Sequence, residues 1–252
     1  MAEQPAVILR NEGGRSPVVL TCEHASNFIP ARYRQLGVSD ADLQRHIAWD
    51  VGAAALAEAL SQALGAPLFL GTHSRLLIDL NRPAGVPSSI PVRSEATDIP
   101  GNRDLAPEER AWREQALLAP YHERIAAFLD RRAGATLLVA IHSFTPIYLG
   151  NRRPWHAGIL FGKAAAFGTA VAQALGREPG LAVDTNVPYR ITREGDYTIP
   201  VHGDDRGIPA ILVEIRNDLL GDAEEIARWC ERLASALNNW VARDSLRAAG
   251  GD

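Results

Sequence analysis

Short apolar runs alternate along the chain with longer segments whose apolar residues recur at helical spacing. The apolar runs predict strands at 17–22, 67–70, 76–78, 136–141, 157–161, 181–183 and 209–215. The helical spacing predicts helices at 50–65, 107–132 and 163–175, and a last helix that starts at Asp222. This alternation predicts an α/β fold, with a mostly parallel or mixed central sheet flanked by helices on both faces, in one domain over residues 1–252.

Two long segments, 81–104 and 184–207, interrupt the alternation. The first contains four prolines and shows no periodicity. Long irregular segments within a compact domain often carry function, for example by closing over a substrate. A mobile surface loop explains the same pattern equally well.

Composition narrows the possible functions. The net charge is -4 over 252 residues, so no basic surface marks a nucleic-acid partner. No apolar run reaches membrane-spanning length, and residues 1–17 lack an apolar signal core. We therefore expect a cytoplasmic protein with no nucleic-acid or membrane partner. The sequence gives no signal for an oligomeric state.

Three ionisable residues stand at or near the ends of predicted strands: His24, His142 and Glu214. Because the carboxyl ends of parallel strands meet at one edge of a sheet, these side chains should lie close together. With only two cysteines, far apart in sequence, a metal would be held by imidazole and carboxylate groups. A catalytic zinc site needs three protein ligands and one open position.

Spacing alone leaves the third ligand open. Glu23 neighbours His24, but adjacent residues of an extended segment point in opposite directions. Asp50 is the better candidate, because the start of its helix can face the same edge of the sheet. The alternative for Asp50 is a carboxylate that only stabilises a helix N-terminus.

Glu214 interrupts an apolar strand. Since burying an unpaired carboxylate costs several kcal/mol, Glu214 must be paired, bound to a metal, or neutral with a raised pKa. A carboxyl group with a raised pKa suits general acid–base chemistry. The alternative is an ion pair with Arg216 or Arg82.

Polar residues around the long segments indicate an anionic, small-molecule substrate. Arg82 and Asn81 stand where the first long segment begins, and a guanidinium group binds a carboxylate through two hydrogen bonds. Arg75 lies nearby and is expected to be solvated. Further candidates for substrate binding are Asn186, Tyr189 and His202 in the second long segment.

Several motifs, taken together and in this order, resemble the N-formylglutamate amidohydrolase family. They are Thr-Cys-Glu-His-Ala-Ser-Asn at 21–27, Trp-Asp-Val-Gly at 49–52, His-Ser-Arg-Leu at 73–76, Asp-Leu-Asn-Arg at 79–82, Ile-His-Ser-Phe at 141–144 and Val-Glu-Ile-Arg-Asn-Asp-Leu at 213–219. The resemblance runs from about residue 18 to residue 219. It implies a phosphorylase/hydrolase-like α/β fold, similar to that of zinc carboxypeptidases and N-acetylmuramoyl-L-alanine amidases.

The resemblance also implies roles for the residues that match these motifs. His24, Asp50 and His142 would hold zinc or another divalent metal, and Glu214 would act as the catalytic acid/base. Arg82 and Arg216 would hold substrate carboxylates. The expected activity is hydrolysis of the amide of an N-acyl amino acid such as N-formylglutamate. The alternatives are an amidase acting on another acylated amine or a cell-wall peptide, and a non-catalytic anion-binding protein of the same fold.

Overall fold

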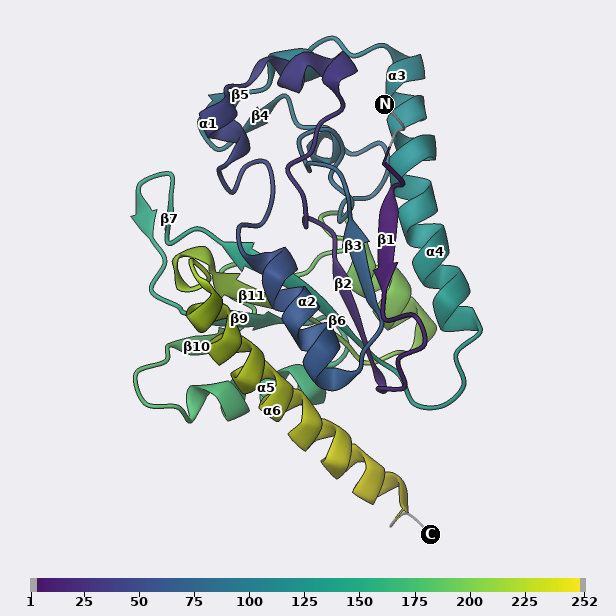
Figure 1. The fold of residues 1–252 in the computed structure, drawn as a ribbon, viewed down its shortest axis with the longest axis vertical. Helices are drawn as coiled ribbons and strands as arrows, with labels where there is room; N and C mark the ends of the chain where they lie inside the picture. Colours follow the sequence, from purple (N-terminus) through teal and green to yellow (C-terminus); the bar gives the residue numbers. More distant parts are fainter. Residues whose placement is uncertain (1–3, 250–252) are drawn as a thin grey trace.

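A seven-stranded sheet forms the centre of the computed structural model, which describes residues 4–249 (Figure 1). Its strands are β1 (Val7–Arg10), β2 (Val18–Cys22), β3 (Leu68–Gly71), β6 (Leu137–Phe144), β9 (Ala157–Leu160), β10 (Val183–Thr185) and β11 (Ala210–Arg216). They lie in the order β1-β3-β2-β6-β11-β9-β10. The neighbours β3, β2, β6 and β11 are parallel, whereas β1 and β9 run antiparallel to their partners β3 and β11. The sheet is therefore mixed, and the predicted α/β fold is confirmed.

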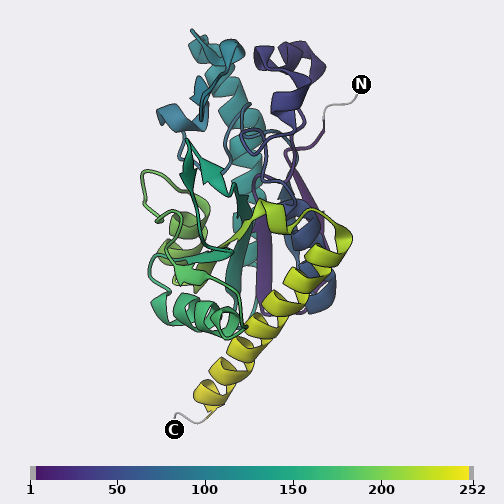
Figure 2. The ribbon, with the colours of Figure 1, turned by 90° about the vertical axis from the view of Figure 1, so that its left-hand side faces the viewer.

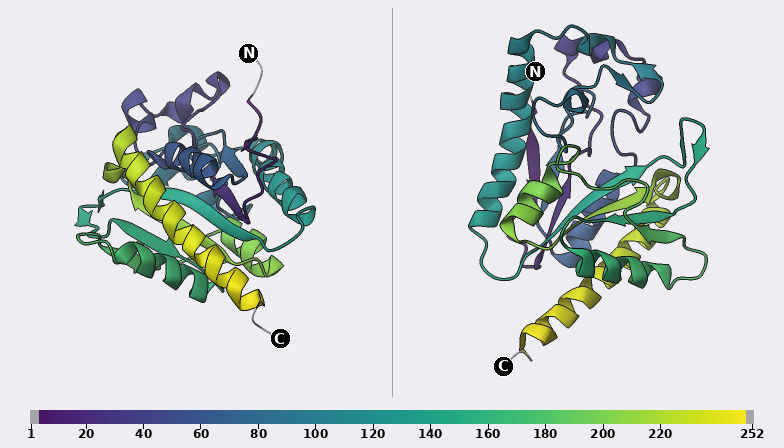
Figure 3. Two further views of the ribbon diagram at one scale, coloured as in Figure 1. Left: turned by 60° about the horizontal axis from the view of Figure 1, so that its bottom comes forward. Right: turned by 180° about the vertical axis from the view of Figure 1, so that it is seen from behind.

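One face of the sheet is covered by three helices, α2 (Ala53–Leu64), α5 (Ala165–Gly176) and α6 (Ala223–Ala249). Helix α6 crosses α2 and α5 and ends beyond the sheet (Figure 3). Leucines of α2 and α6 pack with the apolar residues of the central strands in one buried cluster. No helix within residues 4–249 has the length and apolar character needed to cross a membrane.

On the other face, one long helical run lies along the β1 edge of the sheet (Figures 1 and 3). This run consists of α3 (Pro107–Arg113), a π-helical turn η4 (Glu114–Leu118) and α4 (Ala119–Asp130). A second π-helical segment, η5 (Thr198–Gly203), packs over β6 and β11. Tyr121 and Ile125 of α4 are fully buried in the apolar cluster on this side.

The structure differs from the predicted strands at residues 76–78 and 7–10. Residues 76–78 form no strand, because hydrogen bonds to the Ser74 hydroxyl and carbonyl close a turn that buries the same apolar side chains. Strand β1 was not predicted, since its short run at the edge of the sheet is only partly buried.

The first long segment is ordered structure rather than an irregular loop. It contains the short helices η2 (Pro87–Ser89) and η3 (Pro100–Asn102), separated by a hairpin of β4 (Arg93–Ser94) and β5 (Thr97–Asp98). With η1 (Ala31–Gly37) and α1 (Asp40–Leu43), it gathers beyond the carboxyl ends of β2 and β3 (Figures 1 and 2). A second hairpin of β7 (Ile147–Tyr148) and β8 (Asn151–Arg152) follows β6 and pairs only with itself.

The first long segment is fastened to the body by Asn102. Its side-chain amide donates to the carbonyls of Leu76 and Pro91, each at 2.8 Å, and its oxygen accepts from Arg113 Nη1 at 2.8 Å. Arg113 is 1% exposed and also donates to the Leu77 carbonyl. These contacts satisfy backbone carbonyls that the turn at 76–78 leaves without strand partners.

Asn102→Ala should lower the free energy of unfolding by about 2–3 kcal/mol, because it removes one acceptor of the buried Arg113 guanidinium and the donor to the carbonyls of Leu76 and Pro91. Urea denaturation of the wild type and the variant measures this change. Asn238→Ala, at an exposed position of α6, is the matched control and should change stability by less than about 0.5 kcal/mol. Equal stabilities of the two variants would contradict this role of Asn102.

Candidate metal centre

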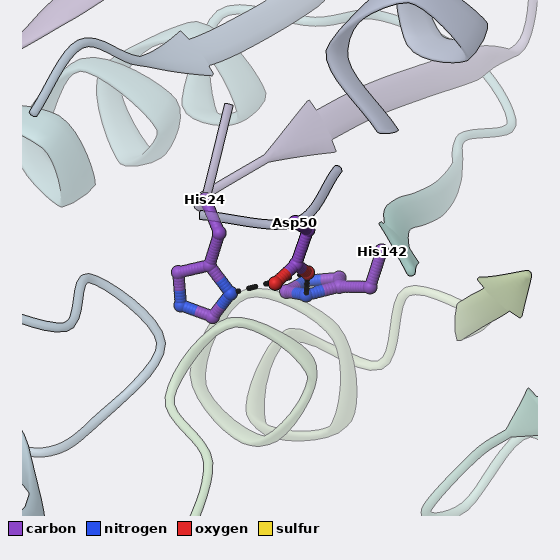
Figure 4. Close-up of side chains that lie close together, drawn as sticks. All are labelled: His24, Asp50 and His142. Carbon is purple, nitrogen blue, oxygen red and sulfur yellow. Dashed lines mark hydrogen bonds and ion pairs between the residues drawn. The ribbon is translucent and has the colours of Figure 1, made fainter. Parts of the chain in front are cut away.

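Three predicted ligands meet at the carboxyl edge of the sheet: His24, Asp50 and His142 (Figure 4). His24 follows β2, and His142 lies near the end of the neighbouring strand β6. Asp50 stands in the turn before α2, where its backbone N–H donates to the His24 carbonyl at 3.0 Å. This bond places the turn directly beside β2, so that Asp50 reaches both imidazoles.

The Asp50 carboxylate lies between the two histidine rings. Its Oδ2 atom is 3.3 Å from His24 Nδ1 and 2.8 Å from His142 Nδ1. The rings are nearly perpendicular, at 83°, with centroids 4.9 Å apart. One potential ligand atom from each of the three residues lies within 4.8 Å of the others, and all three residues are buried. Two imidazole nitrogens and a carboxylate oxygen therefore converge on one point.

The outer nitrogen of each imidazole is held by a second carboxylate. His24 Nε2 lies 2.7 Å from Asp79 Oδ1, and His142 Nε2 lies 2.8 Å from Glu23 Oε2. Metal-binding histidines commonly donate their outer N–H to a carboxylate, which fixes the tautomer and turns the inner nitrogen toward the metal. Glu23 thus points away from the convergence point, as its adjacency to His24 predicts.

These outer carboxylates are themselves hydrogen-bonded. The Thr198 hydroxyl of η5 donates to Glu23 Oε1 at 2.7 Å. Burial opposes ionisation of Glu23, but the hydrogen bonds from His142 and Thr198 outweigh it and lower the pKa of Glu23 to about 2. Asp79 accepts from Arg75 Nη2 at 2.7 Å, and despite burial this guanidinium holds the pKa of Asp79 well below its usual range. Both carboxylates are ionised near neutral pH.

The charge of the site suits a cation. Four buried carboxyl groups surround the two imidazoles: Glu23, Asp50, Asp79 and Glu214. Among the described residues, Arg75 is the only guanidinium that hydrogen-bonds to any of them, through Asp50 and Asp79. Burial lowers the pKa of His142, but hydrogen bonds to Asp50 and Glu23 outweigh it and hold that pKa well above its usual range. A site that draws a proton onto a buried imidazole has an excess of negative charge, and the mixed nitrogen and oxygen donor set fits zinc or a similar divalent metal.

Glu214 stands next to His142 across the pairing of β11 with β6. It is 6% exposed, and its Oε2 atom is buried with no hydrogen-bond partner among the described residues. Burial raises the pKa of the Glu214 carboxyl to about 7. The structure shows no ion pair of Glu214 with Arg216 or Arg82. Glu214 therefore has the proton affinity of a general acid–base group and a free oxygen beside the three clustered side chains.

A cavity of about 510 Å³ opens over this cluster. Seven of the ten predicted site residues line it: His24, Asp50, Asn81, Arg82, His142, Tyr189 and Glu214. The other three, Asn186, His202 and Arg216, do not. Asn186 accepts a hydrogen bond from the Phe161 backbone, His202 is buried against His122, and Arg216 pairs with Asp218. The structure therefore places these three side chains outside the lining of the cavity.

Sequence reasoning missed the outer residues of the site. Arg75, which we expected to be solvated, binds the carboxylates of Asp50 and Asp79. Asp79 and Thr198 had no role in the prediction. For Glu23, the sequence did contain a signal of a role in the site. This residue directly follows a fully buried strand, where an unpaired carboxylate is as unfavourable as it is at Glu214.

The sequence profile of the N-formylglutamate amidohydrolase family matches residues 16–220. The chain belongs to this family. All four clustered side chains, His24, Asp50, His142 and Glu214, lie within the matched region, and the resemblance expected from the sequence motifs is confirmed.

Two solved structures are similar to this family member over almost its whole length. A gene product of Agrobacterium tumefaciens shares 36% sequence identity with this chain and superposes with a TM-score of 0.92. The match covers 96% of this chain and 97% of the Agrobacterium chain. An N-formylglutamate amidohydrolase from Ralstonia eutropha shares 21% sequence identity and superposes with a TM-score of 0.74. This match covers 96% of this chain and 100% of the Ralstonia chain. The second likeness supports the fold. No curated protein matches the sequence.

Glu23→Gln and Asp79→Asn should each weaken zinc binding by about 10- to 100-fold, because each removes the charge that orients one histidine. Chelator competition with metal analysis of the purified proteins measures this affinity. Asp98→Asn, which changes an exposed carboxylate of the β4–β5 hairpin, is the matched control and should leave it unchanged. Wild-type affinity in both outer-carboxylate variants would refute the orienting role.

Proposed function

We propose that this protein is a metal-dependent amidohydrolase that cleaves the amide of an N-acyl amino acid, with N-formylglutamate as the reference substrate. One observation carries the proposal: the His24–Asp50–His142 cluster and a glutamate whose pKa is about 7 share one cavity. Membership of the N-formylglutamate amidohydrolase family supports an amide as the scissile bond.

We assign His24, Asp50 and His142 as the metal ligands. Zinc is the proposed metal, because a catalytic zinc site combines three such ligands with one open position. When bound, the metal would supply Lewis-acid chemistry by polarising the acyl carbonyl and making water more acidic. Asp79 and Glu23 would hold the two histidines in the tautomer that presents Nδ1.

Glu214 is assigned as the group that moves the proton. A carboxyl group with a pKa of about 7 is partly ionised at neutral pH and can both accept and donate a proton. Its carboxylate takes a proton from the attacking water, whose oxygen forms a bond with the acyl carbon. The carboxyl then protonates the nitrogen as the C–N bond breaks, which yields a carboxylic acid and a free amine.

Arg82 is assigned as the anchor for the substrate carboxylate. It lines the cavity, and its nearest carboxylate contacts, to Asp79 and Asp196, are both 3.8 Å long. Arg75, by contrast, is committed to three short contacts with Asp50 and Asp79. The guanidinium of Arg82 therefore has hydrogen-bonding capacity left for a ligand.

The test of the proposal is a panel of N-formyl, N-acetyl and N-succinyl amino acids assayed with added zinc. The wild type should hydrolyse members of the panel, and Glu214→Gln should retain zinc but lose about 10²- to 10⁴-fold in kcat, as expected for removal of a general acid–base group. Glu231→Gln, on the exposed side of α6, is the control and should behave as the wild type. Stoichiometric zinc without hydrolysis of any member would instead favour a binding protein.

Arg82→Ala should raise KM for an N-acyl amino acid more than tenfold, because a charge-assisted hydrogen bond contributes about 1.5–3 kcal/mol. The same substrate with its carboxylate converted to a carboxamide serves as the control, and its KM should change little. Steady-state kinetics with both compounds measures the difference. An equal rise for the two compounds would show that Arg82 does not bind the carboxylate.

A further inference from the structure

Four large apolar side chains of the described chain are exposed, and each either lines the catalytic cavity or is next in sequence to a residue that lines it. They are Val92, Ile147, Leu149 and Tyr189, with 52%, 50%, 58% and 43% of their surface exposed. Tyr189 lines the cavity, Val92 stands between the lining residues Pro91 and Arg93, and Ile147 and Leu149 flank the lining residue Tyr148. Single exposed apolar residues are ordinary on a protein surface, but four at or beside the lining of one cavity mark a binding surface at its mouth.

Arg153 contacts two aromatic residues of the cavity lining. Its guanidinium carbon lies 4.6 Å from the ring centroid of Tyr148 and 4.8 Å from that of Tyr189, and its Nη1 donates to the Tyr189 hydroxyl at 2.8 Å. The two tyrosines come from different segments, the β7–β8 hairpin and the second long segment. Since one cation stacks on both rings, they form a preorganised aromatic wall.

The hairpin also contacts the first long segment. The backbone N–H of Leu149 donates to Glu95 Oε1 at 3.4 Å, at the turn between β4 and β5. The hairpin projects from the body of the molecule (Figure 1), and Ile147 and Leu149 at its tip stay exposed despite this contact. About half of their apolar surface is therefore left uncovered at the tip of the hairpin.

Apolar surface continues from the mouth toward the candidate catalytic residues. Phe144 follows His142 by two positions on β6, and Leu212 precedes Glu214 by two positions on β11, so each shares a strand face with its polar neighbour. Leu160 pairs with Leu212 across β9 and β11. All three apolar residues line the cavity. Apolar side chains of three neighbouring strands thus adjoin the polar cluster in the lining of the cavity.

We propose that the substrate carries an aliphatic or aromatic group in addition to its amide and carboxylate. With the amide at Glu214 and the carboxylate at Arg82, this group would cover Tyr148, Tyr189 and the tip of the β7–β8 hairpin. The inference rests on the proposed function and narrows its substrate class to N-acyl derivatives of hydrophobic amino acids. A substrate with only small or charged groups would leave the apolar mouth in water.

The experiment compares kcat/KM for N-formyl-leucine, N-formylphenylalanine, N-formylalanine and N-formylglutamate with the zinc-loaded wild type. We expect the leucine and phenylalanine compounds to exceed the other two by about tenfold or more, because each buries several further carbon atoms. The double variant Ile147→Thr/Leu149→Asn removes apolar surface from the hairpin tip. Leu149 has a positive φ of 47°, and asparagine adopts positive φ more readily than most residues, so the change should not disturb folding.

The double variant should lower kcat/KM for N-formyl-leucine about tenfold more than for N-formylalanine. Leu149→Met keeps an apolar side chain at the same backbone position and serves as the matched control, so it should retain the preference for the leucine compound. Better hydrolysis of the alanine or glutamate compound by the wild type would overturn the inference and leave the proposed function standing. A double variant that slows both substrates equally would also overturn it.

Two further outcomes separate the remaining explanations. No hydrolysis of any of the four compounds by the zinc-loaded wild type would reject the proposed function, and the inference with it. A wild-type dimer in gel filtration that the double variant converts to a monomer would show that a second copy covers the mouth, which would overturn the substrate assignment.

Discussion

The contact of the Asp50 carboxylate with two imidazole nitrogens is the interaction on which the rest of the site depends. It brings together three parts of the chain: the end of β2, the turn before α2 and the end of β6. A carboxylate buried so completely needs compensation, and His24, His142 and Arg75 all provide it. The buried site thus has a net negative charge, which a divalent cation would neutralise.

The long segments extend outward from this centre. Asp79, which holds His24, lies just before the first long segment, and its carboxylate accepts from the backbone of Asn81. The Asn81 side chain accepts in turn from the backbone N–H of Thr198, the residue whose hydroxyl reaches Glu23. Hydrogen bonds therefore connect both long segments to the outer carboxylates, so the cavity walls and the candidate ligands form one polar network.

Hydrophobic periodicity was enough to predict the sheet, its covering helices and the edge where the site lies, because strands buried on both faces have a strong apolar signal. It failed at 76–78, where an equally apolar run is buried in a turn. It also failed for the outer residues. The roles of Glu23 and Asp79 depend on contacts over 119 and 55 positions, and no local pattern encodes which carboxylate faces which nitrogen. The family motifs predicted the central cluster by supplying that long-range information.

The β7–β8 hairpin forms a sheet of its own and shares no strand with the central sheet. Substitutions at its tip therefore leave strand register unchanged, whereas a shift of β6 or β11 would displace His142 or Glu214. The hairpin tip can thus vary without disturbing the strands that hold the candidate metal ligands and Glu214. In the proposed function, this separation would let the substrate preference change while the residues assigned to catalysis stay the same.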